Sequence, residues 1–284
     1  MIPAILILCL CLMPVQIQAK SVTSGTDNNG NKWTYNTSTK TLVFTGDKAI
    51  SDFAMNGHDR EPSWYRWSNK TEHIVIEEGI TGIGRNAFAG FVKVLSVNIP
   101  YTVKKIKRSS FENNYRLREI QIPNEVISIG DKAFAGCYGL KNLSLPSKLN
   151  YVGSFEFCRN IKSISLPDSI KDTADGMFTG CEMLTSVKLP RKLKAIKAYD
   201  FADCRKLTKL NIPVTVKVVY MSAFAGSGLK KIVLPSNVQK IRNGNDGQKV
   251  FEYIKGVGYP TKNLRVIEIH SKKVKSIQKN SFSG

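Results

Sequence analysis

Residues 122–146 read IPNEVISIGDKAFAGCYGLKNLSLP, and this pattern recurs along the chain. The repeat phenylalanines step by 23 residues, with one step of 21, and stand at Phe88, Phe111, Phe134, Phe155, Phe178, Phe201 and Phe224. The repeat prolines follow the same steps, except for a last one of 22, and stand at Pro100, Pro123, Pro146, Pro167, Pro190, Pro213 and Pro235. A fixed period of this length is typical of a solenoid built from one repeating supersecondary unit.

Each unit contains two short segments that read as strands. Leu143-Ser144-Leu145 alternates apolar and polar residues, the period of a strand with one buried face. Pro146 ends this strand, because proline cannot donate to a ladder. A second apolar run, from Val126 to Ile129, predicts a second strand. One unit cannot bury its apolar residues alone, so neighbouring units stack around a continuous core.

The position two residues after each repeat phenylalanine predicts a turn. Six of its seven residues are glycine, asparagine or aspartate, which tolerate a positive φ: the column is Gly90, Asn113, Gly136, Phe157, Gly180, Asp203 and Gly226. Phe157 breaks the rule, in the unit that is two residues short. We therefore expect a local distortion in that unit.

Four cysteines, Cys137, Cys158, Cys181 and Cys204, share one position three residues after the phenylalanine. In-register stacking places neighbours about 4.8 Å apart, but parallel side chains leave the β-carbons too far apart for a relaxed disulfide. We favour buried free thiols that act as small hydrophobes over disulfide bridges. A straight column does not converge as a zinc site requires, so no metal or cofactor is expected.

Residues 1–19, MIPAILILCLCLMPVQIQA, read as a secretory signal peptide with Ala19 before a plausible cleavage point. The stretch is too short, and too interrupted by Pro3 and Pro14, for a spanning helix. No second apolar span follows in the sequence. We therefore expect a secreted or cell-surface protein with no transmembrane span in the mature chain.

Residues 20–70 depart from the repeat and are rich in aromatic residues. The text WTYNTSTKTLVFTGD predicts a β-hairpin around Ser38-Thr39-Lys40. The end of a solenoid exposes a hydrophobic cross-section that needs a cap. We therefore assign these aromatic residues to the core of an N-terminal cap. The alternative is that they form a ligand-binding pocket. The solenoid then spans residues 71–284, with an irregular insertion at 242–263.

The A-F-x-G-C turn, the L-P strand end and the W-x-Y…P-S-W text ahead of I-V-I-E-E-G-I-T-G-I-G resemble the BspA-type leucine-rich repeat surface proteins. The resemblance implies an α/β but β-rich fold: a right-handed leucine-rich-repeat solenoid of stacked 23-residue coils with a β-rich N-terminal cap. It also implies an exported, adhesin-like protein without a catalytic motif. This sequence departs from typical members in its formal net charge of +20.

Part of that charge falls into one column, four residues after the repeat prolines. Two interpretations stay open: a solvated face that aids solubility, or a strip for a linear polyanion such as a sulfated glycan or lipopolysaccharide. Nucleic acid is disfavoured, because aromatic residues do not interleave with the lysines. The residues concerned are Lys104, Lys171, Lys194 and Lys217, with Arg191 and Lys192 nearby.

The outward positions of the main strand form a second candidate surface. They include Gln121, Ser144, Ser165, Lys188 and Asn211, which make a flat, polar and mostly uncharged strip. Such a face of a solenoid can dock a protein segment, although small polar residues are also compatible with a purely structural surface.

The sequence contains only three histidines and lacks a G-x-S-x-G turn, an H-E-x-x-H helix and a P-loop. We therefore expect a binding protein and not an enzyme, acting as a monomer. The favoured function is adhesin-like docking of host or microbial proteins through the strand face. The alternative is a polyanion-binding protein that uses the lysine column.

Overall fold

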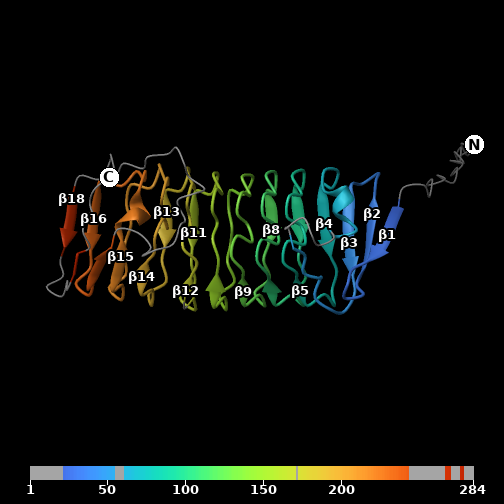
Figure 1. Cartoon of the computed structure of the whole chain (residues 1–284), viewed down its shortest axis with the longest axis horizontal. Helices are drawn as coiled ribbons and strands as arrows, with labels where there is room; N and C mark the ends of the chain where they lie inside the picture. Colours follow the sequence, from blue (N-terminus) through green and yellow to red (C-terminus); the bar gives the residue numbers. More distant parts are fainter. Residues whose placement is uncertain (1–21, 55–60, 171, 243–265, 270–275, 278–284) are drawn as a thin grey trace, which may run out of the picture.

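The computed structural model describes residues 22–54, 61–170, 172–242, 266–269 and 276–277, so the predicted signal peptide and nearly all of the predicted insertion lie outside it. The described residues form one elongated solenoid of stacked coils (Figure 1). Each coil contributes a second strand, as the sequence predicts, but two coils lack the main strand. The predicted strand Leu143–Leu145 is absent and leaves only an isolated bridge between Asn142 and Ser163, and residues 209–212 form no strand. The helical content of the described part is confined to two 3₁₀ turns, η1 (Tyr65–Trp67) and η2 (Met221–Phe224).

The strands run in two parallel rows. The main row consists of β4 (His73–Ile76), β6 (Ser96–Asn98), β8 (Glu119–Gln121), β11 (Ser163–Ser165), β13 (Ser186–Lys188), β16 (Lys231–Leu234) and β18 (Val266–Ile269). The second row consists of β5 (Gly82–Ile83), β7 (Lys105–Ile106), β9 (Ser128–Ile129), β10 (Tyr151–Val152), β12 (Asp172–Thr173), β14 (Ala195–Ile196), β15 (Val218–Tyr220), β17 (Lys240–Arg242) and β19 (Ser276–Ile277).

Residues that pair between neighbouring strands of a row are one sequence repeat apart. Ser96 lies opposite Glu119, one repeat later, and Ser163 lies opposite Ser186. In the short unit Tyr151 still pairs with Ser128 on one side and with β12 on the other. The loss of two residues therefore leaves the second row unbroken from β9 through β10 to β12.

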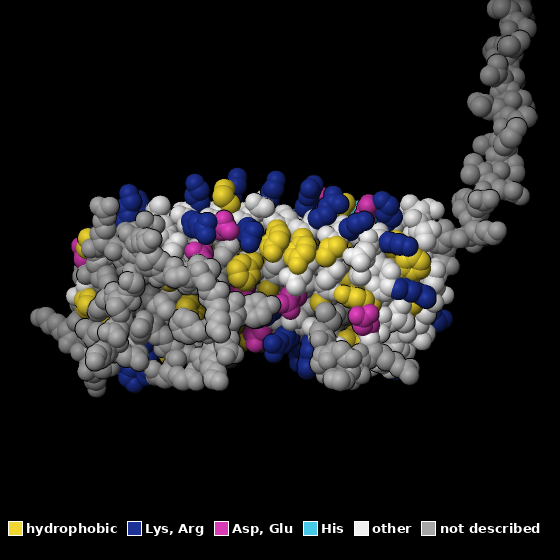
Figure 2. Space-filling view, turned by 45° about the horizontal axis from the view of Figure 1, so that its top comes forward, with side chains coloured by type: hydrophobic (Ala, Val, Ile, Leu, Met, Phe, Trp, Pro, Cys, Tyr) yellow, Lys and Arg dark blue, Asp and Glu magenta, His cyan; other side chains and the backbone are white. Residues whose placement is uncertain are grey.

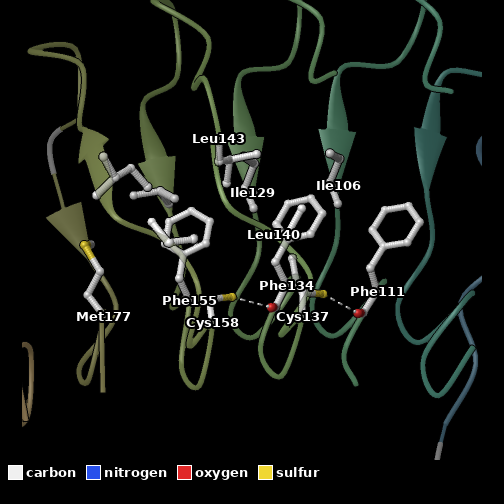
Figure 3. Packing of buried hydrophobic residues seen from close by; sticks show 14 of the residues in the cluster. Ile106, Phe111, Ile129, Phe134, Cys137, Leu140, Leu143, Phe155, Cys158 and Met177 are labelled. Carbon is white, nitrogen blue, oxygen red and sulfur yellow. Dashed lines mark hydrogen bonds between the residues drawn. The ribbon is translucent and has the colours of Figure 1, made fainter. Parts of the chain in front are cut away.

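The core is a column of stacked phenylalanine rings between the two rows. All seven repeat phenylalanines are fully buried, and successive ring centroids lie 5.4 to 6.3 Å apart. Figure 3 shows Phe111, Phe134 and Phe155 in this column, beside Ile106, Ile129 and Leu140 from the strands and turns around them. Offset or parallel stacking of this kind adds to the stabilisation from burial alone.

The predicted left-handed turn is present in all seven units, with φ between 56° and 75°. The expected distortion at Phe157 is therefore wrong, because Phe157 adopts the same conformation at φ 58°. Its backbone N–H bonds Thr179 O at 2.7 Å, which holds it in the common register. Gly180 makes room for its ring: a β-carbon there would lie 2.6 Å from the ring of Phe157.

The four repeat cysteines are buried free thiols, as predicted. Each Sγ donates to the carbonyl oxygen of the phenylalanine in the preceding coil, at 3.1 to 3.2 Å. Figure 3 shows two of these bonds, from Cys137 to Phe111 and from Cys158 to Phe134. Each of these carbonyl groups also accepts from the backbone N–H three residues later, so the thiol supplies a second donor in addition to filling space.

The N-terminal segment begins with the predicted hairpin. β1 (Val22–Thr26) pairs antiparallel with β2 (Lys32–Asn36), and β2 pairs antiparallel with β3 (Thr41–Thr45). β3 then runs parallel to β4, which joins the hairpin to the main row. The aromatic residues of this segment are core residues, since Trp33, Tyr35, Phe44 and Trp64 are at most 1 % exposed.

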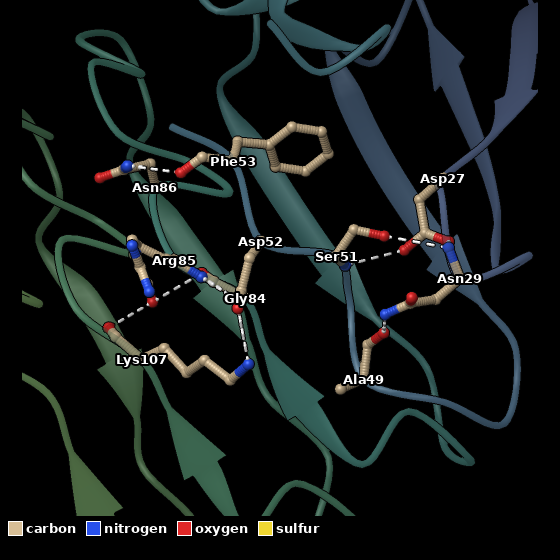
Figure 4. Close-up of polar contacts among 11 residues, drawn as sticks. Asp27, Asn29, Ala49, Ser51, Asp52, Phe53, Gly84, Arg85, Asn86 and Lys107 are labelled. Carbon is tan, nitrogen blue, oxygen red and sulfur yellow. Dashed lines mark hydrogen bonds and ion pairs between the residues drawn. The ribbon is translucent and has the colours of Figure 1, made fainter. Parts of the chain in front are cut away.

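Residues 48–53 extend the second row beyond β5. Ile50 N bonds Gly82 O and Phe53 N bonds Arg85 O, both at 2.9 Å. Two carboxylates hold this segment, as Figure 4 shows: Asp27 accepts from the backbone of Ser51, and Asp52 accepts from Arg85 N and pairs with Lys107. The hydrogen bonds from Arg85 and Lys107 lower the pKa of Asp52 against the opposing effect of its partial burial, which is the largest single influence.

Candidate binding surfaces

The outward residues of the main row lie on one exposed strip, as the sequence predicts. Gln121, Ser144, Ser165, Lys188 and Asn211 are all exposed, and Ser165 lies directly opposite Lys188 in the register. Their side chains have no hydrogen-bond partner within the described part of the chain. The strip therefore presents free polar groups along the main strand side of the coils, although Ser144 and Asn211 themselves lie outside regular strands.

The N-terminal part of this strip is hollowed. A shallow depression of about 220 Å³ lies over β4, β6 and β8. Its polar lining comes from Ser96, Asn98, Glu119 and Gln121, and its floor is apolar. His73 borders this region and its Nδ1 lies 2.8 Å from Ser96 Oγ, so the imidazole belongs to the same polar surface.

The lysine column is partly assembled. Lys194 and Lys217 lie in adjacent coils, joined by a 2.8 Å hydrogen bond from Lys217 N to Lys194 O, and both side chains are exposed. Lys104 belongs to the same column, but Ile127 and Asn150 follow it. Position 171 lies outside the described residues. The column thus brings two of its lysines together and leaves Lys104 apart.

The neighbouring cations are not all free. Arg191 Nε lies 2.6 Å from Asp168 Oδ2, and Arg191 N donates to Oδ1 of the same carboxylate at 2.8 Å. These hydrogen bonds, the backbone one first, lower the pKa of Asp168. Lys192 is exposed and carries no ion pair within the described residues. Asp168 therefore offsets part of the positive charge beside the lysine column.

A second, richer basic surface lies at the turn that precedes the main strand. In each of the seven units, the four residues that stand five to eight positions after the repeat phenylalanine lead into the main strand. Together these segments contain nine cations and one carboxylate, Glu119. We call these nine residues the basic edge: Lys93, Arg116, Arg118, Lys141, Lys162, Lys206, Lys209, Lys230 and Lys231. All nine are exposed, and Figure 2 shows Lys and Arg side chains along the upper edge of the solenoid.

Sequence reasoning missed this edge because its cations occupy four different offsets from the phenylalanine, from five to eight residues. The signal was nevertheless present in Arg118, Lys141 and Lys162, which stand seven residues after successive phenylalanines. Lys231 is paired with Glu268 at 2.6 Å. The other eight have no ion-pair partner within the residues that the structure describes.

A ladder of stacked side chains borders the basic edge, four residues after the phenylalanine. Tyr115 stacks on Tyr138 at 4.8 Å between ring centroids, and the Arg159 guanidinium lies 4.9 Å from the Tyr138 centroid. Glu182 then forms ion pairs with both Arg159 and Arg205, at 3.6 and 3.9 Å. The ladder covers both faces of the Tyr138 ring, and Arg205 also lies 3.8 Å from Asp203 Oδ1, so two carboxylates compensate its two arginine charges.

One buried carboxyl lies inside the turn column. Asp200 is 5 % exposed and accepts from Lys197 N at 2.7 Å and from Met177 N at 3.3 Å. Burial raises the pKa of Asp200 to about 8, although these two hydrogen bonds act in the opposite direction. No group of three or more His, Cys, Asp or Glu side chains is placed to hold a metal ion in the described ranges. His58 lies outside them.

Within the described ranges, no helix has the length and apolar character needed to cross a membrane. A search of curated protein sequences finds no match. Among solved structures, a leucine-rich repeat protein from Bacteroides ovatus superposes with a TM-score of 0.52 at 24 % identity, over 89 % of this chain and 78 % of that one. This likeness shows the solenoid fold.

Two further structures are similar at lower scores. A leucine-rich repeat protein of T. pallidum gives a TM-score of 0.49 at 22 % identity, over 67 % of this chain and 90 % of that one. A leucine-rich cell surface protein from Faecalibacterium prausnitzii gives 0.41 at 16 % identity, over 92 % and 96 %. The sequence profile of the BspA-type leucine-rich repeat region matches residues 61–157 and 153–255 in six copies, which is more than half of the chain. The chain therefore belongs to the family of BspA-type leucine-rich repeat proteins.

Proposed function

We propose that this protein is a secreted or cell-surface, adhesin-like module that docks host or microbial proteins through its main strand face. The observation that carries the proposal is the exposed strip of unpaired polar side chains at Gln121, Ser144, Ser165, Lys188 and Asn211. Small side chains on a rigid strand scaffold lose little conformational entropy on binding and let a partner backbone approach closely. The repeat architecture, which forms an extended surface, supports binding in preference to catalysis.

Export is part of this proposal and rests on the apolar segment that ends at Ala19. N-terminal sequencing of the protein recovered from the cell surface or the medium tests it directly. We expect the mature chain to begin at Lys20. An intact Met1 on the surface-exposed protein would contradict cleavage at this point.

Polyanion binding through the lysine column is the second candidate. The observation that favours it is the backbone pairing of Lys194 with Lys217 in adjacent coils, since like charges at strand spacing repel unless solvent or a ligand compensates them. Two adjacent cations act together on an anion, because their separation of about 4.8 Å is shorter than the Debye length of about 8 Å at physiological salt.

A binding screen separates the two candidates. The immobilised chain would be exposed to purified extracellular matrix proteins, such as collagen and laminin, and to sulfated glycans, at several salt concentrations. Docking on the mostly uncharged strip predicts protein binding that changes little with salt. Binding only to polyanions, with a steep loss of affinity as salt rises, would contradict the proposed function and favour the second candidate.

A further inference from the structure

We propose that the basic edge is a binding site for a linear sulfated glycan, separate from both the strand face and the lysine column. The edge follows the long axis of the solenoid from Lys93 in the first phenylalanine unit to Lys230 in the last. Six steps at a strand spacing of about 4.8 Å give a row roughly 29 Å long. A straight row of this length fits an extended polymer better than the curved surface of a folded acidic protein.

The charges of this edge are available to a ligand. Eight of its nine cations have no ion-pair partner within the described residues, and Glu119 is the one carboxylate in the same segments. Arg118, Lys141 and Lys162 occupy three consecutive coils, so they span about 10 Å. Cations this close act as a group on a polyanion at physiological ionic strength.

The neighbouring ladder argues for a glycan over a single-stranded nucleic acid. Proteins that bind single strands offer free aromatic faces on which bases stack. Tyr138 has both ring faces covered, by Tyr115 and by Arg159. Because Glu182 also holds Arg159 and Arg205, the ladder adds a nearly neutral border beside the basic edge. The free groups at this edge are thus cations without an accessible aromatic face beside them, which suit the sulfates of a glycan chain.

The test compares two triple variants of the full chain that remove the same charge. One is Arg118→Gln, Lys141→Gln and Lys162→Gln on the basic edge, and the control is Lys104→Gln, Lys194→Gln and Lys217→Gln in the lysine column. Binding to heparin is measured over a range of salt concentrations. Every substituted side chain described by the structure is exposed, so thermal unfolding should be the same in both variants and the unchanged chain.

We expect the basic-edge variant to lose at least about tenfold in heparin affinity near physiological salt. The slope of log affinity against log salt concentration should become shallower by an amount that corresponds to about two to three fewer released counterions. The control variant should retain nearly the full affinity. The charge-conserving variant Arg118→Lys, Lys141→Arg and Lys162→Arg should bind as the unchanged chain does. Heparin stripped of its sulfates should bind weakly to all of them.

Three results would overturn the proposal. Equal losses in the two triple variants would show that only net charge matters, and a loss confined to the control would assign the glycan to the lysine column. Tighter binding of duplex DNA than of heparin, with the same dependence on Arg118, Lys141 and Lys162, would identify a nucleic-acid site. None of these results bears on protein docking at the strand face, so the two proposals can fail separately.

Discussion

Cys158 donates its thiol hydrogen to the carbonyl oxygen of Phe134 in the preceding coil, with Sγ 3.1 Å from O. The same relationship links Cys137 to Phe111. The Phe134 carbonyl also accepts from Cys137 N at 3.2 Å, so the Cys158 thiol is its second donor, which alanine could not supply. Burial raises the pKa of the Cys158 thiol to about 12, which keeps the hydrogen that makes this bond.

The repeat thiols should be unreactive in the folded protein. At pH 8 we expect Cys137, Cys158, Cys181 and Cys204 to resist a thiol reagent until the chain is unfolded, because each is fully buried and its thiol pKa is raised by burial. Mass mapping after alkylation in denaturant would check this. Recovery of a Cys137–Cys158 or Cys181–Cys204 bridge would contradict it.

Asn114 occupies the cysteine position in the coil before Cys137, and replacing it with cysteine should make the protein more stable. It is fully buried, and neither its side-chain oxygen nor its nitrogen has a hydrogen-bond partner. Asn114→Cys should raise the free energy of unfolding by about 1 to 3 kcal/mol, because it removes unsatisfied polar atoms from the core. Denaturant unfolding measures the change. The reverse exchange, Cys137→Asn, serves as the control and should lower stability.

Phe157 offers a direct measure of backbone strain. Its φ of 58° disfavours any residue with a β-carbon. Phe157→Gly and Phe157→Ala both remove the ring that packs on Gly180, so their difference isolates the backbone contribution. We expect the glycine variant to be more stable by about 1 to 2 kcal/mol. Equal stabilities would show that the turn relaxes when the ring is removed.

Asp200 should make stability fall as pH rises. Its folded pKa of about 8 lies above its ordinary value of 3.8, so between these limits the folded chain binds more protons than the unfolded chain. The stabilisation that comes from the protonated Asp200 carboxyl is complete below pH 3.8, declines as the pH rises above that value, and is lost as the pH passes through about 8. In urea unfolding from pH 4 to 9, Asp200→Asn should remove a slope of up to about 1.4 kcal/mol per pH unit. Parallel pH profiles for the two proteins would contradict this account.

The sequence was sufficient for the parts of the fold that depend on strict periodicity. A 23-residue register, with apolar positions at fixed offsets, predicts the second strand row, the main row except at 143–145 and 209–212, the phenylalanine column and the buried thiols. The left-handed turn after each phenylalanine was visible because glycine, asparagine and aspartate dominate that position. Phe157 was misjudged since hydrogen bonds from the flanking coils impose the conformation whatever the residue.

Other features carried no compositional signal. A second left-handed column stands two residues before the phenylalanine, at Asn86, Ser109, Lys132, Gly176 and Tyr199, where only one residue is glycine. The basic edge escaped notice for a geometric reason. Residues at several offsets flank one turn, so they converge on the same edge only after the coil is folded. The strand face was predicted residue by residue, because alternation alone decides which side chains point outward.

Blocking the strand face tests the central claim most directly. Ser144→Arg with Ser165→Arg places two bulky cations in the proposed docking strip, whereas Asn124→Arg with Ser147→Arg adds the same charge at exposed positions just after two repeat prolines. Affinity for the matrix protein that binds the unchanged chain is then measured by surface plasmon resonance. The account predicts a loss of at least about tenfold, or 1.4 kcal/mol, in the first variant and little change in the second. Equal affinity in both variants would place the protein partner elsewhere on the solenoid and contradict the claim.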